Sequence, residues 1–151
     1  MEITAGNDLI VSAPAGAGET TLSANAGIET FYAHIYGGPG GYDYFIAGSD
    51  IHFGKDVVIE ANAGMSYSDE SGPYGGEITI SPQGRFTLDG TIKAKGFGAA
   101  GMGGKIKTHA PGGVQIGKKG HMNVRARNAG TIYLIADGEV DIDGLIDMRQ
   151  D

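Results

Sequence analysis

The chain contains no cysteine and no tryptophan, and only 5 of its 151 residues are proline. The lack of cysteine excludes disulfide bridges, thiolate catalysis and thiolate metal ligands. No apolar stretch approaches the roughly 18 residues that a membrane helix needs, so no membrane partner is predicted. The first four residues, Met-Glu-Ile-Thr, do not begin a signal peptide. We therefore expect either cytosolic folding or a trimmed piece of an exported protein.

Glycine, by contrast, is abundant, with 28 residues, well over twice the share expected from an average usage of about 7%. Aromatic residues make up only 8% of the chain, so a core must be built mainly from Ile, Val, Leu and Ala. This mixture predicts many short strands joined by tight turns in which glycine supplies positive φ angles. The glycines do not recur at every third position, which excludes a collagen helix.

Two segments, residues 76–92 and 130–146, align without gaps and share the pattern G-x-I-x-[IL]-x-x-x-G-x-[FV]-x-[LI]-D-G-x-I. A variant of the same pattern spans residues 104–117. The first glycine of the pattern recurs as Gly76, Gly104 and Gly130, at nearly equal spacings. Inside each copy apolar residues alternate with polar ones, which indicates strands with one buried face.

The repeat predicts an all-β fold, a right-handed parallel β-helix of about five coils with a period of about 26–28 residues. We expect a single solenoid domain over residues 1–151. Within it, residues 1–47 form an irregular start and residues 48–151 the regular coils. The alternative is a β-sandwich with glycine-rich hairpins, which usually has longer strands.

The phrases Gly-Glu-Ile-Thr-Ile at 76–80 and Leu-Asp-Gly-Thr-Ile at 88–92 resemble coils of filamentous-haemagglutinin-type adhesins. They are equally similar to β-helical parts of bacteriophage virions. The resemblance implies a solenoid fold and a structural or adhesive role, and it carries no site residues. The Asn-Pro-Asn motifs of the adhesin family's secretion domain do not occur in this sequence, which argues against two-partner secretion.

Charge is segregated along the chain. Residues 1–84 have a net charge of −10, residues 85–127 of +8 and residues 128–151 of −5. Because sequence blocks become bands along a solenoid axis, we expect a basic belt between acidic ends. The belt consists of Arg85, Lys93, Lys95, Lys105, Lys107, Lys118, Lys119, Arg125 and Arg127. It either solvates the surface or docks an acidic neighbour, a protein subunit or a polyanionic glycan.

Six of the twelve aromatic residues lie within residues 31–45, where they flank a Gly-Gly-Pro-Gly-Gly segment. We interpret this stretch as an excursion from the coils that serves as a cap, as an interface, or as both. The candidate interface residues are Phe31, Tyr32, Tyr36, Tyr42, Tyr44 and Phe45. The belt segment, residues 85–127, contains only two aromatic residues, Phe86 and Phe97, which disfavours nucleic acid as a partner.

No catalytic, cofactor or metal site is predicted. Four carboxylates alternate near the C-terminus, Asp137, Asp141, Asp143 and Asp147, and we interpret them as a solvated outer face. Paired carboxylates could also serve glycoside hydrolysis, but the companion signatures of pectin-hydrolysing β-helices are missing. Residues 37–43 come near a calcium-binding nonapeptide and fail it, because Tyr42 stands where an aspartate is needed.

These observations predict a non-catalytic structural or assembly protein with protein partners. A phage virion component, either a capsid decoration protein or a fibre or spike element, folded in the host cytoplasm, is the first candidate. The alternative is a fragment of a bacterial surface adhesin or extracellular matrix fibre, and a carbohydrate-active β-helix enzyme comes third. We expect a homo-oligomer, with a trimer among the options, or a larger assembly.

Overall fold

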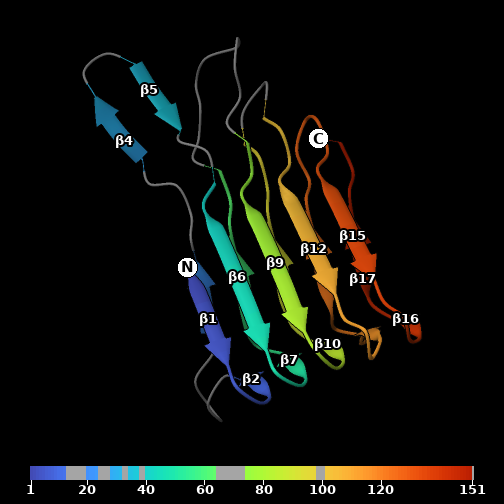
Figure 1. Ribbon diagram of the computed structural model, residues 1–151. Helices are drawn as coiled ribbons and strands as arrows, with labels where there is room; N and C mark the ends of the chain where they lie inside the picture. Colours follow the sequence, from blue (N-terminus) through green and yellow to red (C-terminus); the bar gives the residue numbers. More distant parts are fainter. Residues whose placement is uncertain are drawn as a thin grey trace.

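The computed structural model describes residues 1–12, 20–23, 28–31, 34–37, 40–63, 74–97 and 101–150. Every regular element in this part of the chain is a strand, and no helix in it could span a membrane. Fifteen of the seventeen strands form three five-stranded sheets in which all pairs are parallel (Figure 1). The predicted all-β fold of stacked parallel strands is confirmed.

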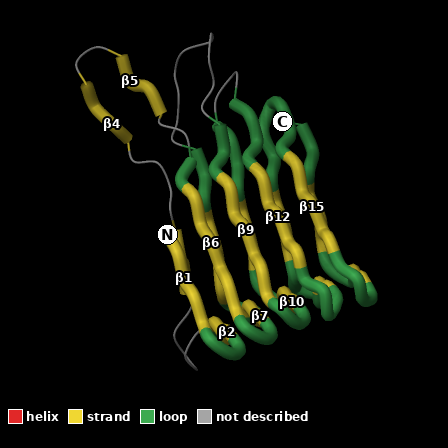
Figure 2. Tube along the Cα trace, in the orientation of Figure 1, coloured by secondary structure: helices red, strands yellow, loops and turns green. Residues whose placement is uncertain are grey.

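Each sheet takes one strand from each of five successive units of the chain, as Figure 2 shows for the stacked yellow segments. Sheet A contains β1 (Glu2–Ala5), β6 (Tyr42–Ala47), β9 (Glu77–Pro82), β12 (Lys105–His109) and β15 (Thr131–Ile135). Sheet B contains β2 (Leu9–Val11), β7 (Ile51–Phe53), β10 (Phe86–Leu88), β13 (Val114–Ile116) and β16 (Val140–Ile142). Sheet C contains β3 (Thr20–Ser23), β8 (Val57–Glu60), β11 (Thr91–Lys93), β14 (His121–Asn123) and β17 (Leu145–Asp147).

The repeat shortens along the chain. The predicted period holds for the later units, since Glu77 pairs with Lys105 and Lys105 with Thr131. It is wrong for the earlier units, which are longer, as the pairing of Glu2 with Tyr44 shows. The extra residues lie between strands, so the stacking register is kept.

The prediction that residues 1–47 form an irregular start is wrong in part. Strands β1, β2 and β3 already make up a first unit, and they pair in register with β6, β7 and β8. The true excursion is an antiparallel pair, β4 (Ile28–Phe31) and β5 (His34–Gly37), inserted between the first and second units. Residues 42–45, the end of the predicted excursion, belong to strand β6 of sheet A.

Side chains from all three sheets meet in one buried cluster. Its widest members are three phenylalanines in edge-to-face contact: the ring centroid of Phe53 lies 5.0 Å from that of Phe45 and 5.7 Å from that of Phe86. Aliphatic residues of the alternating positions fill the rest, including Ile59, Ile78, Ile80, Leu88, Ile92, Ile106 and Ile116, all with no exposed surface. The alternation in sequence therefore identifies the inward face correctly.

Glycine is needed here mainly because successive units stack closely, and less because the backbone adopts unusual φ angles. A Cβ atom on Gly104 would lie 2.0 Å from the carbonyl oxygen of Gly76, and one on Gly130 would lie 2.1 Å from that of Gly104. Among the described residues only Gly113 has a positive φ, of 112°. Our expectation of many positive-φ turns is therefore wrong for this part of the chain. The recurring glycine marks a corner where successive units touch backbone to backbone.

Candidate interaction surfaces

The predicted aromatic cluster is divided by the fold. Tyr42 and Tyr44 point outward from β6, with 60% and 39% of their surface exposed. Phe45, by contrast, is fully buried in the core, so its assignment to an interface is wrong. The reason is the strand alternation itself, which sends neighbouring residues to opposite faces of a sheet. Phe31 and Tyr36 lie on β4 and β5, and Tyr32 lies outside the described residues.

The outer face of sheet A collects exposed apolar side chains from strands far apart in sequence. Ile46, from β6, is 38% exposed, and Tyr133 and Ile135, from β15, are 46% and 54% exposed. Between these two strands lie β9 and β12, whose outward residues are smaller or charged. A hollow of about 400 Å³ lies on this face, lined by Thr79, Ser81, Lys107, Thr108, His109, Tyr133 and Ile135.

Sequence reasoning missed the β15 residues of this face. The signal was present, because the pattern aligns Tyr133 and Ile135 with the polar, outward positions of the other repeats. Lys107 pairs with Tyr133, and His109 pairs with Ile135, in the β12–β15 register. Apolar residues at outward positions that are polar in the other repeats indicate an interaction surface.

The predicted basic belt surrounds the middle units on several sides. Lys105 and Lys107 lie on β12 in sheet A, Lys93 lies on β11 in sheet C, and Lys118 and Lys119 form the turn between β13 and β14. Arg85 precedes β10, Lys95 follows β11, and Arg125 and Arg127 follow β14. The belt residues therefore do not share one face.

Acidic residues of neighbouring units neutralise part of the belt. The Nζ atom of Lys93 lies 2.7 Å from Oε1 of Glu60, which is its partner in the β8–β11 register. The Nζ atom of Lys107 lies 2.6 Å from Oε1 of Glu77, its diagonal neighbour on β9, and this hydrogen bond raises the pKa of Lys107. Stacking thus pairs charges that lie far apart in sequence.

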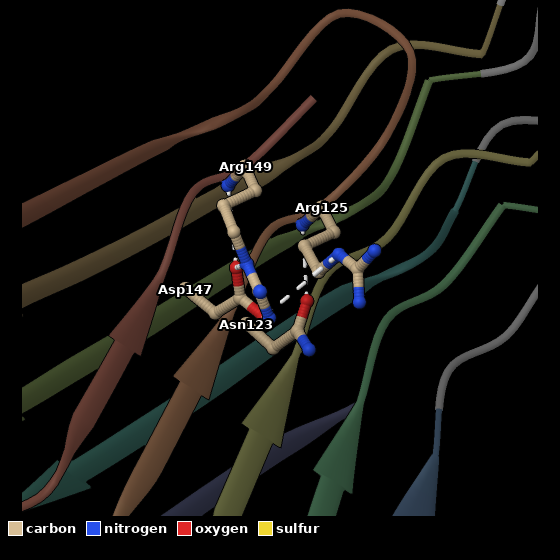
Figure 3. A network of polar contacts seen from close by, with 4 residues as sticks. All are labelled: Asn123, Arg125, Asp147 and Arg149. Atoms are coloured by element: carbon tan, nitrogen blue, oxygen red, sulfur yellow. Dashed lines mark hydrogen bonds and ion pairs between the residues drawn. The ribbon is translucent and has the colours of Figure 1, made fainter. Parts of the chain in front are cut away.

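Figure 3 shows a polar network at the end of sheet C that involves one of the predicted outer-face carboxylates. Asp147 accepts hydrogen bonds from Nε and Nη2 of Arg149, at 2.9 and 2.8 Å, and Nε of Arg125 lies 3.8 Å away. Asn123, its register partner, accepts a bond from the backbone of Arg125. Only 3% of the Asp147 side chain is exposed, so its assignment to a solvated face is wrong. The hydrogen bond from Arg149 holds the pKa of Asp147 below its usual range.

The other three carboxylates of this series, at positions 137, 141 and 143, are exposed as expected. Asp141 lies on β16, next to Gln115 in the sheet B register. The described residues hold no group of three or more His, Cys, Asp or Glu side chains placed to bind a metal ion.

Within the part of the chain that the structure describes, one charged residue points into the core. Asp43 on β6 is fully buried, in register with Ile78, where the aligned positions of the later units are also isoleucine. The ammonium group of Met1 lies 3.4 Å from its carboxylate, which accepts no hydrogen bond from the described residues. Burial raises the pKa of Asp43 against the opposing effect of that ammonium group.

No protein-family model, no curated protein and no solved structure matches this chain.

Proposed function

We propose that this chain is a non-catalytic structural protein that assembles with protein neighbours as a component of a phage virion. A capsid decoration protein and a fibre or spike element both fit this role. The observation that carries the proposal is the two groups of exposed tyrosine and isoleucine side chains on the outer face of sheet A, one on β6 and one on β15. Exposed apolar side chains that gather on one face are typical of interaction sites.

The sheet beneath these side chains supports an assembly role. The outward residues of β6 alternate with Phe45 and Ala47, which the core holds with 0% and 1% exposure. A face anchored in this way presents its side chains with little conformational freedom, and a preorganised surface loses less entropy on binding.

We further propose that the three sheets close into a right-handed β-helix. Connections between parallel strands of one sheet are right-handed in about 98% of cases, because of the twist of the strands. A closed helix leaves only its two ends with unpaired strand edges, which suits a small building block exposed on a particle.

One of the carboxylates considered for catalysis supports a structural role as well. Asp147 is held by Arg149 and lies close to Arg125, so it stabilises the corner of the last unit. Such a carboxylate is a poor general acid, since its pKa is lowered rather than raised.

The proposal is tested by finding where the native protein resides. Particles from the producing culture would be purified on a density gradient and probed with an antibody against the chain, followed by immunogold labelling. We expect the protein in the particle fraction, with gold on capsids or tails. Recovery only from the cell surface or the secreted fraction would overturn the virion role and support the adhesin alternative. Turnover of an acidic polysaccharide by the purified chain would overturn the non-catalytic role.

A further inference from the structure

We infer that the outer face of sheet A is a self-complementary interface and that its partner is a second copy of this chain. The two copies would be related by a two-fold axis that runs parallel to the strands, midway between β9 and β12. This inference rests on the proposed assembly role and names one partner and one surface for it.

The outward side chains of four adjacent strands form three rows. The first contains Tyr42, Glu77, Lys105 and Thr131, and the second contains Tyr44, Thr79, Lys107 and Tyr133, as the strand registers show. In the third row Ile46 is in register with Ser81, and His109 with Ile135. The aromatic and large apolar residues of these rows therefore lie on the flanking strands β6 and β15, and the inner strands β9 and β12 carry polar ones.

The proposed axis places β6 of one copy over β15 of the other, and β9 over β12. Each row of one copy then faces the same row of the second copy. Tyr44 then faces Tyr133 of the second copy, and Ile46 faces its Ile135. In the first row Glu77, which also accepts a hydrogen bond from Lys107 of its own chain, faces Lys105 of the second copy, so opposite charges meet twice in the dimer. Isologous contacts of this kind are what a closed two-fold dimer requires.

The alternative two-fold axis, along the stacking direction, fits poorly. It would place each strand over its own copy with the first row facing the third. Lys107 would then lie against Lys107 of the second copy, and Lys105 against its His109. Like charges placed opposite each other across an interface are costly, so the charge pattern selects the axis between β9 and β12.

The relief of the face agrees with the same arrangement. The hollow is lined by the short side chains Thr79 and Ser81 of β9 and by the longer side chains Lys107 and His109 of β12. The proposed axis puts β12 of one copy over β9 of the other. His109 of one copy therefore lies over Ser81 of the other in both halves of the interface, a long side chain over a short one, as close packing requires.

The size of the face sets the expected strength of the dimer. Four strands at about 4.8 Å spacing and five residues at about 3.3 Å give a footprint of roughly 19 by 17 Å. This is smaller than the roughly 800 Å² per partner of a stable interface, so we expect a weak, concentration-dependent dimer.

Charge exchange at the facing pair provides the first test. Sedimentation equilibrium of the full chain would be measured over a wide concentration range, for the native protein and for Glu77→Lys, Lys105→Glu and the double variant. Each single variant should weaken dimerisation at least about tenfold, and the double variant should restore most of it. Asp141→Lys on sheet B and Lys118→Glu in the turn before β14 change the charge equally, and they should leave dimerisation unchanged.

Cross-linking tests the axis itself, and the cysteine-free chain makes it selective. A Tyr44→Cys chain mixed with a Tyr133→Cys chain should be joined by a short bis-maleimide, because facing sheets lie about 10 Å apart. Either variant alone should not be joined, since its two copies of the cysteine are offset by about three strand spacings, or about 14 Å. Cross-linking of each variant with itself, but not of the mixture, would select the other axis and overturn the inference.

A native chain that stays monomeric at high concentration would overturn the inference, even if the chain is found in particles. A monomer whose β9 and β15 amide signals shift on adding polygalacturonate would overturn it too, and would assign the face to an acidic glycan. Conversely, a dimer that loses affinity in the single charge variants and regains it in the double variant, from a chain absent from particles, would support the interface and refute the virion role.

Discussion

Replacing Gly104 with alanine tests whether the recurring glycine is required by close stacking of successive units. The added Cβ atom would lie 2.0 Å from the carbonyl oxygen of Gly76 and 2.6 Å from the carbonyl carbon of Gly75. Both contacts are with backbone, so no side-chain rotation relieves them. Gly104 also donates a hydrogen bond to Ala94, at 2.7 Å, and the next amide, of Lys105, donates to Gly76 at 2.9 Å.

The magnitude follows from the movement that the methyl group demands. The two units must separate by about 1 Å, and overpacking of this kind costs about 1–3 kcal/mol. The two backbone hydrogen bonds stretch at the same corner, at about 1 kcal/mol each. We therefore expect a loss of about 4 kcal/mol, which lowers the urea midpoint by about 2 M if the slope is about 2 kcal/mol per M.

Equilibrium urea unfolding followed by circular dichroism measures this change. Gly6→Ala is the matched control, because a Cβ atom at Gly6 would meet nothing within 4 Å, and its midpoint should stay near that of the native chain. If Gly104→Ala yields no folded protein, Gly130→Ala would be measured in its place. Gly130 belongs to the last unit, which packs against only one neighbouring unit and can shift more easily. Equal midpoints for the Gly104 and Gly6 variants would refute the stacking argument.

Two further substitutions test the charged residues of the stack. Asp43→Ile should stabilise the chain by about 1–4 kcal/mol at pH 7, as replacements of buried ion pairs by apolar residues often do. Because the folded-state pKa of Asp43 is raised, ionisation of this buried carboxyl destabilises the native chain as the pH rises above about 4, so the stability gain of the variant should increase with pH. A gain that is the same at all pH values would contradict the raised pKa. Asp147→Asn should lower the urea midpoint at pH 7. Because the folded-state pKa of Asp147 is depressed by Arg149, the loss should shrink below about pH 4, and a loss unchanged at about pH 3 would refute the role of that ion pair.

Much of the fold could be predicted from the sequence because its signals are local and repeated. Alternation such as Ile78 and Ile80 identifies the inward face, and both residues are fully buried. The recurrence of glycine at 76, 104 and 130 gives the period of the later units, which the strand registers confirm. The first units were harder to predict, because residues inserted between their strands lengthen the repeat without changing the register.

The candidate surface was less predictable. Distance along the chain groups Phe45 with the neighbouring tyrosines, whereas burial depends on which side of the strand each residue occupies. Tyr133 and Ile135 went unnoticed, because they join Tyr44 only when β15 is placed three strands away in the same sheet. To predict which residues share a surface that crosses several strands, one must know the register of each strand pair. A single sequence reveals that register only where the repeats align.

The sequence by itself determined the class of fold, the inward residues and the segregation of charge, because these depend on composition, on alternation along each strand and on the recurrence of the glycine pattern. Only the tertiary structure decided which charges neutralise one another and which side chains share a face. Lys107 meets Glu77, and Asp147 meets Arg125, through the stacking of units. The recurring glycine belongs to both levels. Its spacing is visible in the sequence, but its cause, a backbone contact between units, exists only in the folded stack.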